Sequence, residues 1–326
     1  IDLKIRDARL AGVGLSGEAK KRFNQLTTEL SQLGTNFSNN VLDSTKEYEM
    51  IITDKDETDG WPNNLKQQSS QSYNQTKEIK ESLPEEGPWR ISLEASMVIP
   101  FLRHSKIRHQ REKLLKAYVS RANDGELDNK PLIMKILKLK QEMANILEFN
   151  TYAELSLASK MASDVDAVER MFTELFEASK SYQLKEYTEI ENIAKRNGFS
   201  EKIAKWDTAF WAERLKEEKF SFTDDELRPY FPMTRVLEGM FSLAEYLFGI
   251  KIIDADGKAP VWHPDVKYFI VYEGREKIAS FYLDPYSRPG EKRGGAWMDN
   301  CLNKRIIDGK IRFPVIYLIT NVTPPV

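Results

Sequence analysis

The dominant spacing of apolar residues along the 326-residue chain changes at Gly249. Before that glycine, apolar side chains recur every three or four residues, a spacing that places them on one face of an α-helix. After it, short runs of β-branched and aromatic residues alternate with Gly, Pro and charged residues, which is typical of strands. We therefore expect a predominantly α-helical α+β fold, with a helical region at 1–249 and a sheet-containing region at 250–326.

Start and stop signals divide the first region into helices. Caps and apolar periodicity predict helices over 16–47, 105–119, 129–147, 163–198 and 234–248. The helix at 234–248 is apolar on nearly every side, so we expect it to be central. The long helix at 163–198 is expected to bury a stripe made of Val165, Val168, Phe172, Leu175, Tyr182, Ile190 and Ile193.

A different pattern interrupts the helices near the start of the chain. Residues 48–53 and 89–93 are short strand candidates that can pair as a hairpin-like ribbon. Between them, residues 59–88 are polar, with Pro and Gly at both ends, so we expect a surface helix or lobe there and not part of the core.

Composition excludes several classes of partner. The 48 Lys and Arg nearly balance the 50 Asp and Glu, which gives a net charge of −2 and no general attraction to phosphate, so nucleic acid is not an expected partner. No apolar run approaches the roughly 18–20 residues that cross a bilayer, so no membrane is expected either. The single cysteine, Cys301, fits a reducing compartment, and the cytoplasm is the expected location.

The histidines offer weak candidates for a metal or a general base. His104 and His109 are five residues apart, which places them on different faces of a helix. His263 precedes a strand; Asp265 can fix its tautomer, or the two residues can simply form a capped turn. The sequence contains no Gly-x-Ser-x-Gly elbow and no phosphate-binding glycine loop, so it indicates neither a serine nucleophile nor a nucleotide site.

The segment from Phe281 to Asp299 is the most informative for binding. It contains a strand, a basic turn, and then Gly294, Gly295 and Ala296, where small residues leave the backbone open to a close neighbour. An extended peptide can pair with such a backbone whatever its own sequence. A bulge or a tight turn explains the same residues without any ligand.

At this point the sequence resembles a known family, the oligopeptidase A branch of the thimet-type (M3 family) zinc oligopeptidases. The resemblance covers practically the whole chain in the same order. It rests on NNVLDSTKEYEM (39–50), YAELSLASKMA (152–162), WDTAFWAERL (206–215), ELRPYFPMTRVLEGMF (226–241), VWHPDVKYF (261–269), FYLDPYSRPGEKRGGAWMD (281–299) and NVTPPV (321–326).

The resemblance implies a mostly helical, two-lobed, zincin-like molecule that cleaves short peptides with a zinc-bound water. In that family a His-Glu-x-x-His helix and a later glutamate hold the zinc, and no such set occurs in residues 1–326. The chain is therefore expected to be a central fragment of a zinc metalloendopeptidase. It is expected to carry no catalytic residue and no metal of its own, and to be inactive alone, although full-length members use zinc.

The resemblance assigns a binding role to one stretch. Residues matching Gly294, Gly295, Ala296, Trp297 and Met298 lie beside the active-site cleft of the family, where they are expected to pair with substrate. Arg288 and Arg293 are candidates for contacts with a peptide carboxylate, the alternative being a solvated basic loop.

The expected partners are short peptides, together with the missing catalytic lobe or another protein chain. The rival hypothesis is a non-catalytic helical scaffold, or a degenerate paralogue, that binds a partner protein. A transit peptide ahead of Ile1 would place the protein in the mitochondrial matrix or the plastid stroma instead of the cytoplasm.

Overall fold

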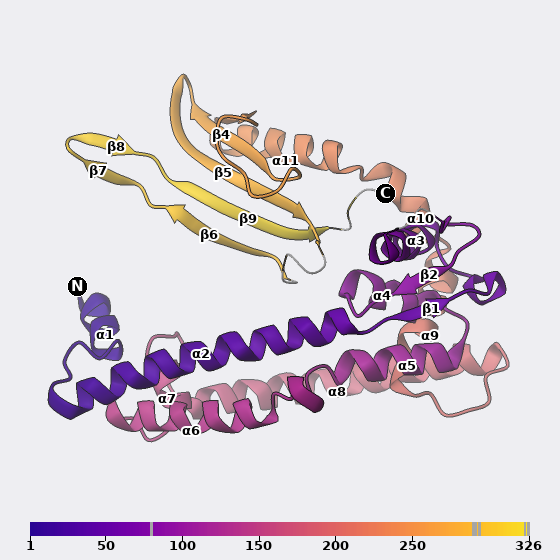
Figure 1. The fold of residues 1–326 in the computed structure, drawn as a ribbon, viewed down its shortest axis with the longest axis horizontal. Helices are drawn as coiled ribbons and strands as arrows, with labels where there is room; N and C mark the ends of the chain where they lie inside the picture. The colour runs from indigo at the N-terminus through magenta and orange to yellow at the C-terminus, as the bar shows by residue number, and fades with distance from the viewer. Residues whose placement is uncertain (79–80, 289–291, 293–294, 323, 325–326) are drawn as a thin grey trace. The chain divides into compact units, whose positions relative to one another are not determined.

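The computed structural model describes residues 1–78, 81–288, 292, 295–322 and 324 (Figure 1). The chain divides into two compact units. The first contains residues 1–49 and 109–215, and the second contains residues 50–108 and 216–326. The chain thus passes from the first unit into the second at residue 50, returns to the first at residue 109 and enters the second again at residue 216.

The first unit is helical. Leu26 and Leu33 of the long helix α2 pack against Leu139 of α6, which forms an interhelical core. Figure 1 shows these two helices side by side. The helices that lie wholly or mainly in this unit are α1 (Asp2–Leu10), α2 (Gly17–Glu47), α5 (Arg108–Val119), α6 (Lys130–Ile146), α7 (Tyr152–Leu157), α8 (Val165–Arg196) and α9 (Lys205–Phe220), with a 3₁₀ turn at Gly125–Leu127.

A buried ion pair joins α5 to α9. Arg111 Nη2 donates to Asp207 Oδ1 at 2.8 Å, and the two side chains are 3% and 0% exposed. The same guanidinium donates through Nε to the carbonyl of Trp206 at 3.1 Å and lies 4.4 Å from the centre of the Phe210 ring. Several partners thus compensate for removing the guanidinium from water.

The apolar stripe of α8 differs from the expectation. Of the predicted stripe, Ile193 is buried, where it packs with Phe210 and Trp211 of α9, whereas Phe172 and Tyr182 are 60% and 70% exposed. A one-sided apolar pattern predicts a face that needs a neighbour, and the described residues provide one mainly at the carboxyl end of this helix.

The second unit begins with the expected ribbon. Strand β1 (Met50–Ile52) pairs antiparallel with β2 (Trp89–Ile91), so the two short strand predictions are confirmed. The connecting segment contains α3 (Asn63–Lys77), whose Leu65 and Ser69 are fully buried, so this polar segment is not a surface segment throughout. Small serine side chains allow close packing that a polar composition does not reveal. The remaining elements here are α4 (Ala95–His104) and a 3₁₀ turn at Lys55–Thr58.

A five-stranded sheet follows, in the order β3-β4-β5-β9-β6 (Figure 1). The central strands β5 and β9 run parallel, and the other neighbouring pairs are antiparallel. The prediction of a predominantly helical α+β fold with a small sheet near its carboxyl end is confirmed. The strands are β3 (Ile250–Asp254), β4 (Lys267–Glu273), β5 (Glu276–Tyr286), β6 (Trp297–Leu302) and β9 (Val315–Val322), with a separate hairpin of β7 (Arg305–Ile307) and β8 (Lys310–Arg312).

The helix before the sheet, α11 (Met233–Phe248), is less covered than its sequence predicts. Phe241 packs against Phe269 and Phe281, with ring centres 5.0 Å and 6.3 Å away, but none of the helix residues is buried in the described structure. An all-round apolar helix needs neighbours on every side, and here the sheet supplies one side. The expectation of a central helix is therefore wrong for this chain. Short helical segments precede it at Asp224–Leu227 (α10) and Arg228–Tyr230.

The change from helix to strand falls where it was expected. Helix α11 ends at Phe248, Gly249 closes it with a φ of +66°, and β3 begins at Ile250. Whether residues 1–249 and 250–326 also correspond to separate lobes stays a prediction. In the part of the chain that the structure describes, no helix is both long and apolar enough to cross a bilayer.

Removing the buried carboxylate of α9 tests the packing of the first unit. We expect Asp207→Ala to lower the free energy of unfolding by about 3–5 kcal/mol, because it leaves the Arg111 charge buried without that carboxylate. Urea unfolding followed by circular dichroism measures the loss. The matched control is Glu142→Ala, which removes the partner of Arg22 from a half-exposed ion pair. We expect a much smaller effect there, and equal losses in the two variants would contradict this account.

Candidate functional site

Strand β6 lies at an edge of the five-stranded sheet. Among the described residues its one strand neighbour is β9, with Trp297 opposite Ile319 and Asn300 opposite Ile316. Every second residue of an edge strand directs its N–H and C=O away from the sheet, where they can pair with another chain. Trp297 and Met298, at the start of the strand, are 51% and 70% exposed. Strand β6 is therefore an edge strand with exposed side chains at its start.

A bulge changes the direction of the strand near its end. The pairing with β9 shifts between Asn300 and Leu302, so Cys301 is the extra residue. A hydrogen bond with the Cys301 thiol, together with burial, raises the pKa of Tyr317 on β9. The bulge therefore brings a small, polarisable side chain onto the central strand.

Aromatic rings line the same side of the sheet as Tyr317. Its ring centre lies 5.7 Å from that of Tyr282, 5.6 Å from that of Trp262 and 6.3 Å from that of Trp297. These contacts extend from β5 across β9 to the edge strand. A peptide paired with β6 would find apolar and aromatic surface beside its alternate side chains.

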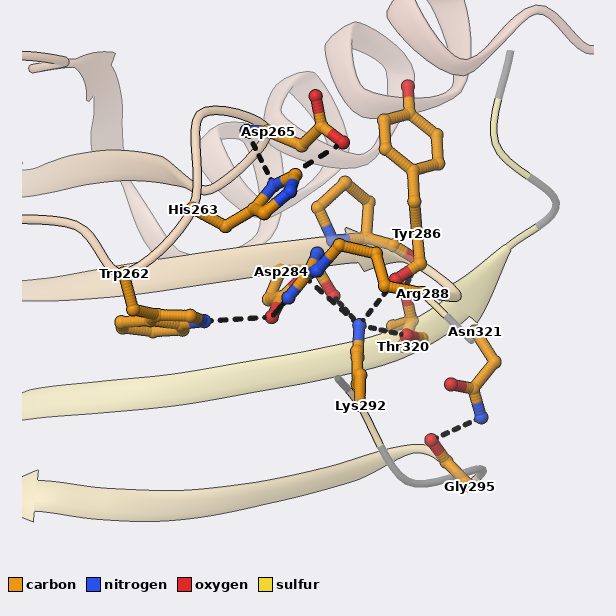
Figure 2. A network of polar contacts seen from close by, with 11 residues as sticks. Trp262, His263, Asp265, Asp284, Tyr286, Arg288, Lys292, Gly295, Thr320 and Asn321 are labelled. Carbon is orange, nitrogen blue, oxygen red and sulfur yellow. Dashed lines mark hydrogen bonds and ion pairs between the residues drawn. The ribbon is translucent and has the colours of Figure 1, made fainter. Parts of the chain in front are cut away.

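Asp284, near the end of β5, is the centre of a buried polar network (Figure 2). Arg288 donates from Nη1 and Nη2 to the two carboxylate oxygens, each at 2.7 Å. Trp262 Nε1 donates to Oδ2 at 3.0 Å, and Lys292 Nζ donates to Oδ1 at 3.0 Å. The Asp284 side chain is 3% exposed. We call these four residues, Asp284, Arg288, Lys292 and Trp262, the Asp284 cluster.

The cluster keeps this carboxylate charged. Burial by itself would raise the pKa of Asp284, but hydrogen bonds from Arg288, Trp262 and Lys292 outweigh it and hold the pKa at about 2. Two cations share one carboxylate, so the cluster carries a net charge of about +1. It therefore depends on further acceptors, which the backbone of the neighbouring strands provides.

The described residues between β5 and β6 contact the carboxyl end of β9, the strand that lies between those two. Ser287 N donates to the carbonyl of Val322 at 2.9 Å, and the amide of Asn321 donates to the carbonyl of Gly295. Lys292 reaches the carbonyl of Thr320 at 2.6 Å (Figure 2). The described parts of the connection are thus attached to the end of β9 at several points.

The predicted binding residues fall at the start of this edge. Trp297 and Met298 are the first two residues of β6, and Gly295 and Ala296 precede them directly. Gly295 has a φ of +111°, which an L-residue rarely adopts. Gly294 and Arg293 lie outside the described residues. The binding role of this stretch stays a prediction.

Arg288 has an internal partner that the sequence did not indicate. Both of its terminal nitrogens are bound to Asp284, so it is not the solvated loop residue of the alternative reading. Its proposed contact with a peptide carboxylate stays a prediction. Sequence reasoning missed Asp284 and Lys292 as a pair, although an acid beside Pro285 at the end of an apolar run, with basic residues four and eight positions later, is a detectable signal.

The histidines belong to other local structures than this edge. Asp265 N donates to His263 Nδ1 at 3.2 Å, and Asp265 Oδ2 lies 3.5 Å from the same nitrogen, which is the geometry of a capped turn. His104 ends α4, and His109 lies in the first turn of α5. Among the described residues no group of three or more His, Cys, Asp or Glu side chains could hold a metal ion.

Comparison with known proteins gives a consistent result. Residues 101–326 match peptidase family M3. Across the whole chain, the sequence is 43% identical to organellar oligopeptidase A (chloroplastic/mitochondrial) and 40% identical to the probable cytosolic oligopeptidase A, both of Arabidopsis thaliana. It is 35% identical to oligopeptidase A of Escherichia coli (strain K12). The chain covers 42%, 47% and 48% of these relatives, which is less than half of each.

Removing the charge of Asp284 tests the cluster. Its folded pKa of about 2 is below the usual 3.8, so its contribution to stability is complete above about pH 4 and is lost as the pH falls toward 2. The depression corresponds to roughly 2 kcal/mol at neutral pH. We expect Asp284→Asn to lose at least about that much at pH 7 and to lack the acid-dependent loss.

Urea unfolding at pH 7 and pH 3 measures both effects. The control is Asp265→Asn, which removes an exposed carboxylate from the same unit. Parallel pH dependence in the wild type and in Asp284→Asn would show that this carboxylate is not the acid-sensitive group.

Proposed function

The chain belongs to the oligopeptidase A branch of peptidase family M3, and we propose that it binds short peptides along the open edge of β6. The observation that carries this proposal is the position of β6 at the end of the strand order, with exposed Trp297 and Met298 at its start. Backbone pairing accepts many side-chain sequences, which suits a peptidase that acts on varied short peptides.

The proposed contacts have separate roles. Backbone groups of the stretch Gly294 to Met298 would pair with the peptide, and the aromatic side of the sheet would support its alternate side chains. Arg288 would act through its place in the Asp284 cluster, and a contact of Arg293 with the peptide carboxylate remains part of the proposal.

We assign no step of hydrolysis to these residues. The family resemblance implies zinc in full-length members, but the described side chains do not fit a zinc site, since they bring together no three suitable ligands. The curated relatives are more than twice as long as this stretch, and we propose that the zinc ligands belong to the part that it does not cover. Residues 1–326 alone would then bind peptides without cleaving them.

The exposed side of α11 favours a second candidate function, the binding of a protein partner. Leu243, Leu247 and Phe248 are 57%, 59% and 70% exposed on a helix that packs on the sheet through Phe241. A contiguous apolar helix face is expected to be covered in the working protein. We propose that the remaining portion of an M3 catalytic lobe covers this face. The alternative is that this chain is a scaffold and that an unrelated protein covers the face.

For location, we propose the cytoplasm, with the mitochondrial matrix or the plastid stroma as the alternative. The relatives named above include a cytosolic and an organellar form.

A hexapeptide with blocked ends, and versions of it in which single backbone nitrogens are methylated, test binding at β6. An acetylated and amidated hexapeptide matches the six residues of the strand. Methylation of one backbone nitrogen at a time should weaken binding about tenfold at every second position, because alternate N–H groups face the strand. Isothermal titration or NMR titration measures the affinities. Uniform effects along the peptide would exclude pairing with an edge strand.

A hydrolysis assay tests the proposal that residues 1–326 alone bind peptides without cleaving them. We expect residues 1–326 to leave the same hexapeptide intact with or without added zinc, because the described side chains bring together no set of ligands that could activate water. Mass spectrometry of the peptide after incubation measures cleavage. Adding a second polypeptide that carries the remaining part of an oligopeptidase A chain should restore chelator-sensitive cleavage. Zinc-dependent cleavage by residues 1–326 alone would refute the assignment, and failure of the second polypeptide to bind would favour the scaffold.

A further inference from the structure

Lys292 occupies an unusual position for a lysine in a basic turn. Its ammonium lies within hydrogen-bonding distance of four oxygens: the carbonyls of Asp284, Tyr286 and Thr320 at 3.0, 2.7 and 2.6 Å, and Asp284 Oδ1 at 3.0 Å. The side chain is 8% exposed. A lysine is rarely buried unless its charge has specific partners, so this arrangement calls for a reason beyond solubility.

Neutralising Asp284 is not a sufficient reason. Arg288 already binds both carboxylate oxygens of Asp284 in a bidentate pair. Three of the four oxygens around the Lys292 ammonium belong instead to the backbone, at the ends of β5 and β9. A small cation with three donors can join several carbonyls that a planar guanidinium could not reach together. Lys292 therefore links the two parallel strands at their carboxyl ends.

The position of this link matters because of the strand order. The chain leaves β5 and begins β6 on the far side of β9. Lys292 attaches the connection to Thr320, and Asn321 attaches it again at Gly295, two residues before β6 (Figure 2). A slip of one residue between β6 and β9 would exchange the two faces of the edge strand. The two attachments lie just before the start of β6, where they can prevent such a slip.

We propose that Lys292 is a positioning residue, which fixes the register of β6 on β9 and so determines which backbone groups and side chains the edge presents to a peptide. This inference rests on the proposed function, in which the peptide pairs with β6. Asp284 serves as the carboxylate that holds the ammonium in place, and Asn321 is the second attachment.

The variant Lys292→Met tests the proposal in the full 326-residue chain. It keeps an unbranched side chain, one atom shorter than that of lysine, and removes the donors. The matched control is Lys304→Met, at an exposed lysine in the connection after β6. Cross-strand NOEs between Trp297 and Ile319 report the register of β6, and those between Tyr268 and Tyr282 report the sheet interior. Titration with the blocked hexapeptide, with and without nitrogen methylation, reports the open edge.

We expect Lys292→Met to lose the Trp297–Ile319 contacts while it keeps the Tyr268–Tyr282 contacts, and to bind the hexapeptide about tenfold more weakly. Lys304→Met should match the wild type in all three measurements. If Lys292→Met does not fold, Asn321→Ala tests the second attachment, and partial loss of the same contacts is expected. An unchanged register in a folded Lys292→Met or Asn321→Ala variant would overturn the proposal. If the wild type itself does not bind the hexapeptide, the proposed function fails, whereas the register measurement still decides the role of Lys292.

Discussion

The contacts between the carboxyl ends of β5 and β9 depend on one buried carboxylate. Asp284 accepts hydrogen bonds from an arginine, a lysine and a tryptophan, and this set of donors outweighs the cost of burying its charge. Because the donors come from the strand connection and from the segment before β4, the carboxylate fixes both relative to β5. Lys292 extends this arrangement to β9 through the carbonyl of Thr320. These contacts position the start of β6.

The two faces and the edge of the sheet have different environments. Phe269 and Phe281 receive the α11 helix through Phe241 on one face, and tyrosines and tryptophans line the other. Both faces therefore have side-chain contacts, while the outer backbone of β6 has no strand neighbour among the described residues. An open edge is normally a risk for aggregation. Its presence in a member of a peptidase family is consistent with a ligand that is itself an extended chain.

Local features of the fold were predictable from the sequence, and long-range contacts were not. The periodicity of residues 16–47 and the β-branched runs after Gly249 predict the helix α2 and the strands β3 and β4 correctly, since each depends on neighbouring residues. The exposure of α11 and of Phe172 on α8 was not predictable, because an apolar face shows the need for a partner without identifying it. For the site, Gly294 and Gly295 predicted a peptide-binding stretch directly before the start of β6. The edge position of that strand, however, depends on the insertion of β9 between β5 and β6. The role of Lys292 depends on the same insertion.

The central claim, that β6 is the strand to which a peptide adds, is tested most directly by amide hydrogen exchange resolved by residue. The exchange of the amides from Trp297 to Leu302 is measured with and without the blocked hexapeptide, and the opposite edge strand β3 serves as the internal reference. The account predicts that the peptide slows exchange at alternate β6 amides and leaves the amides of β3 unchanged. Slower exchange at β3, or at neither edge while the peptide is bound, would contradict it.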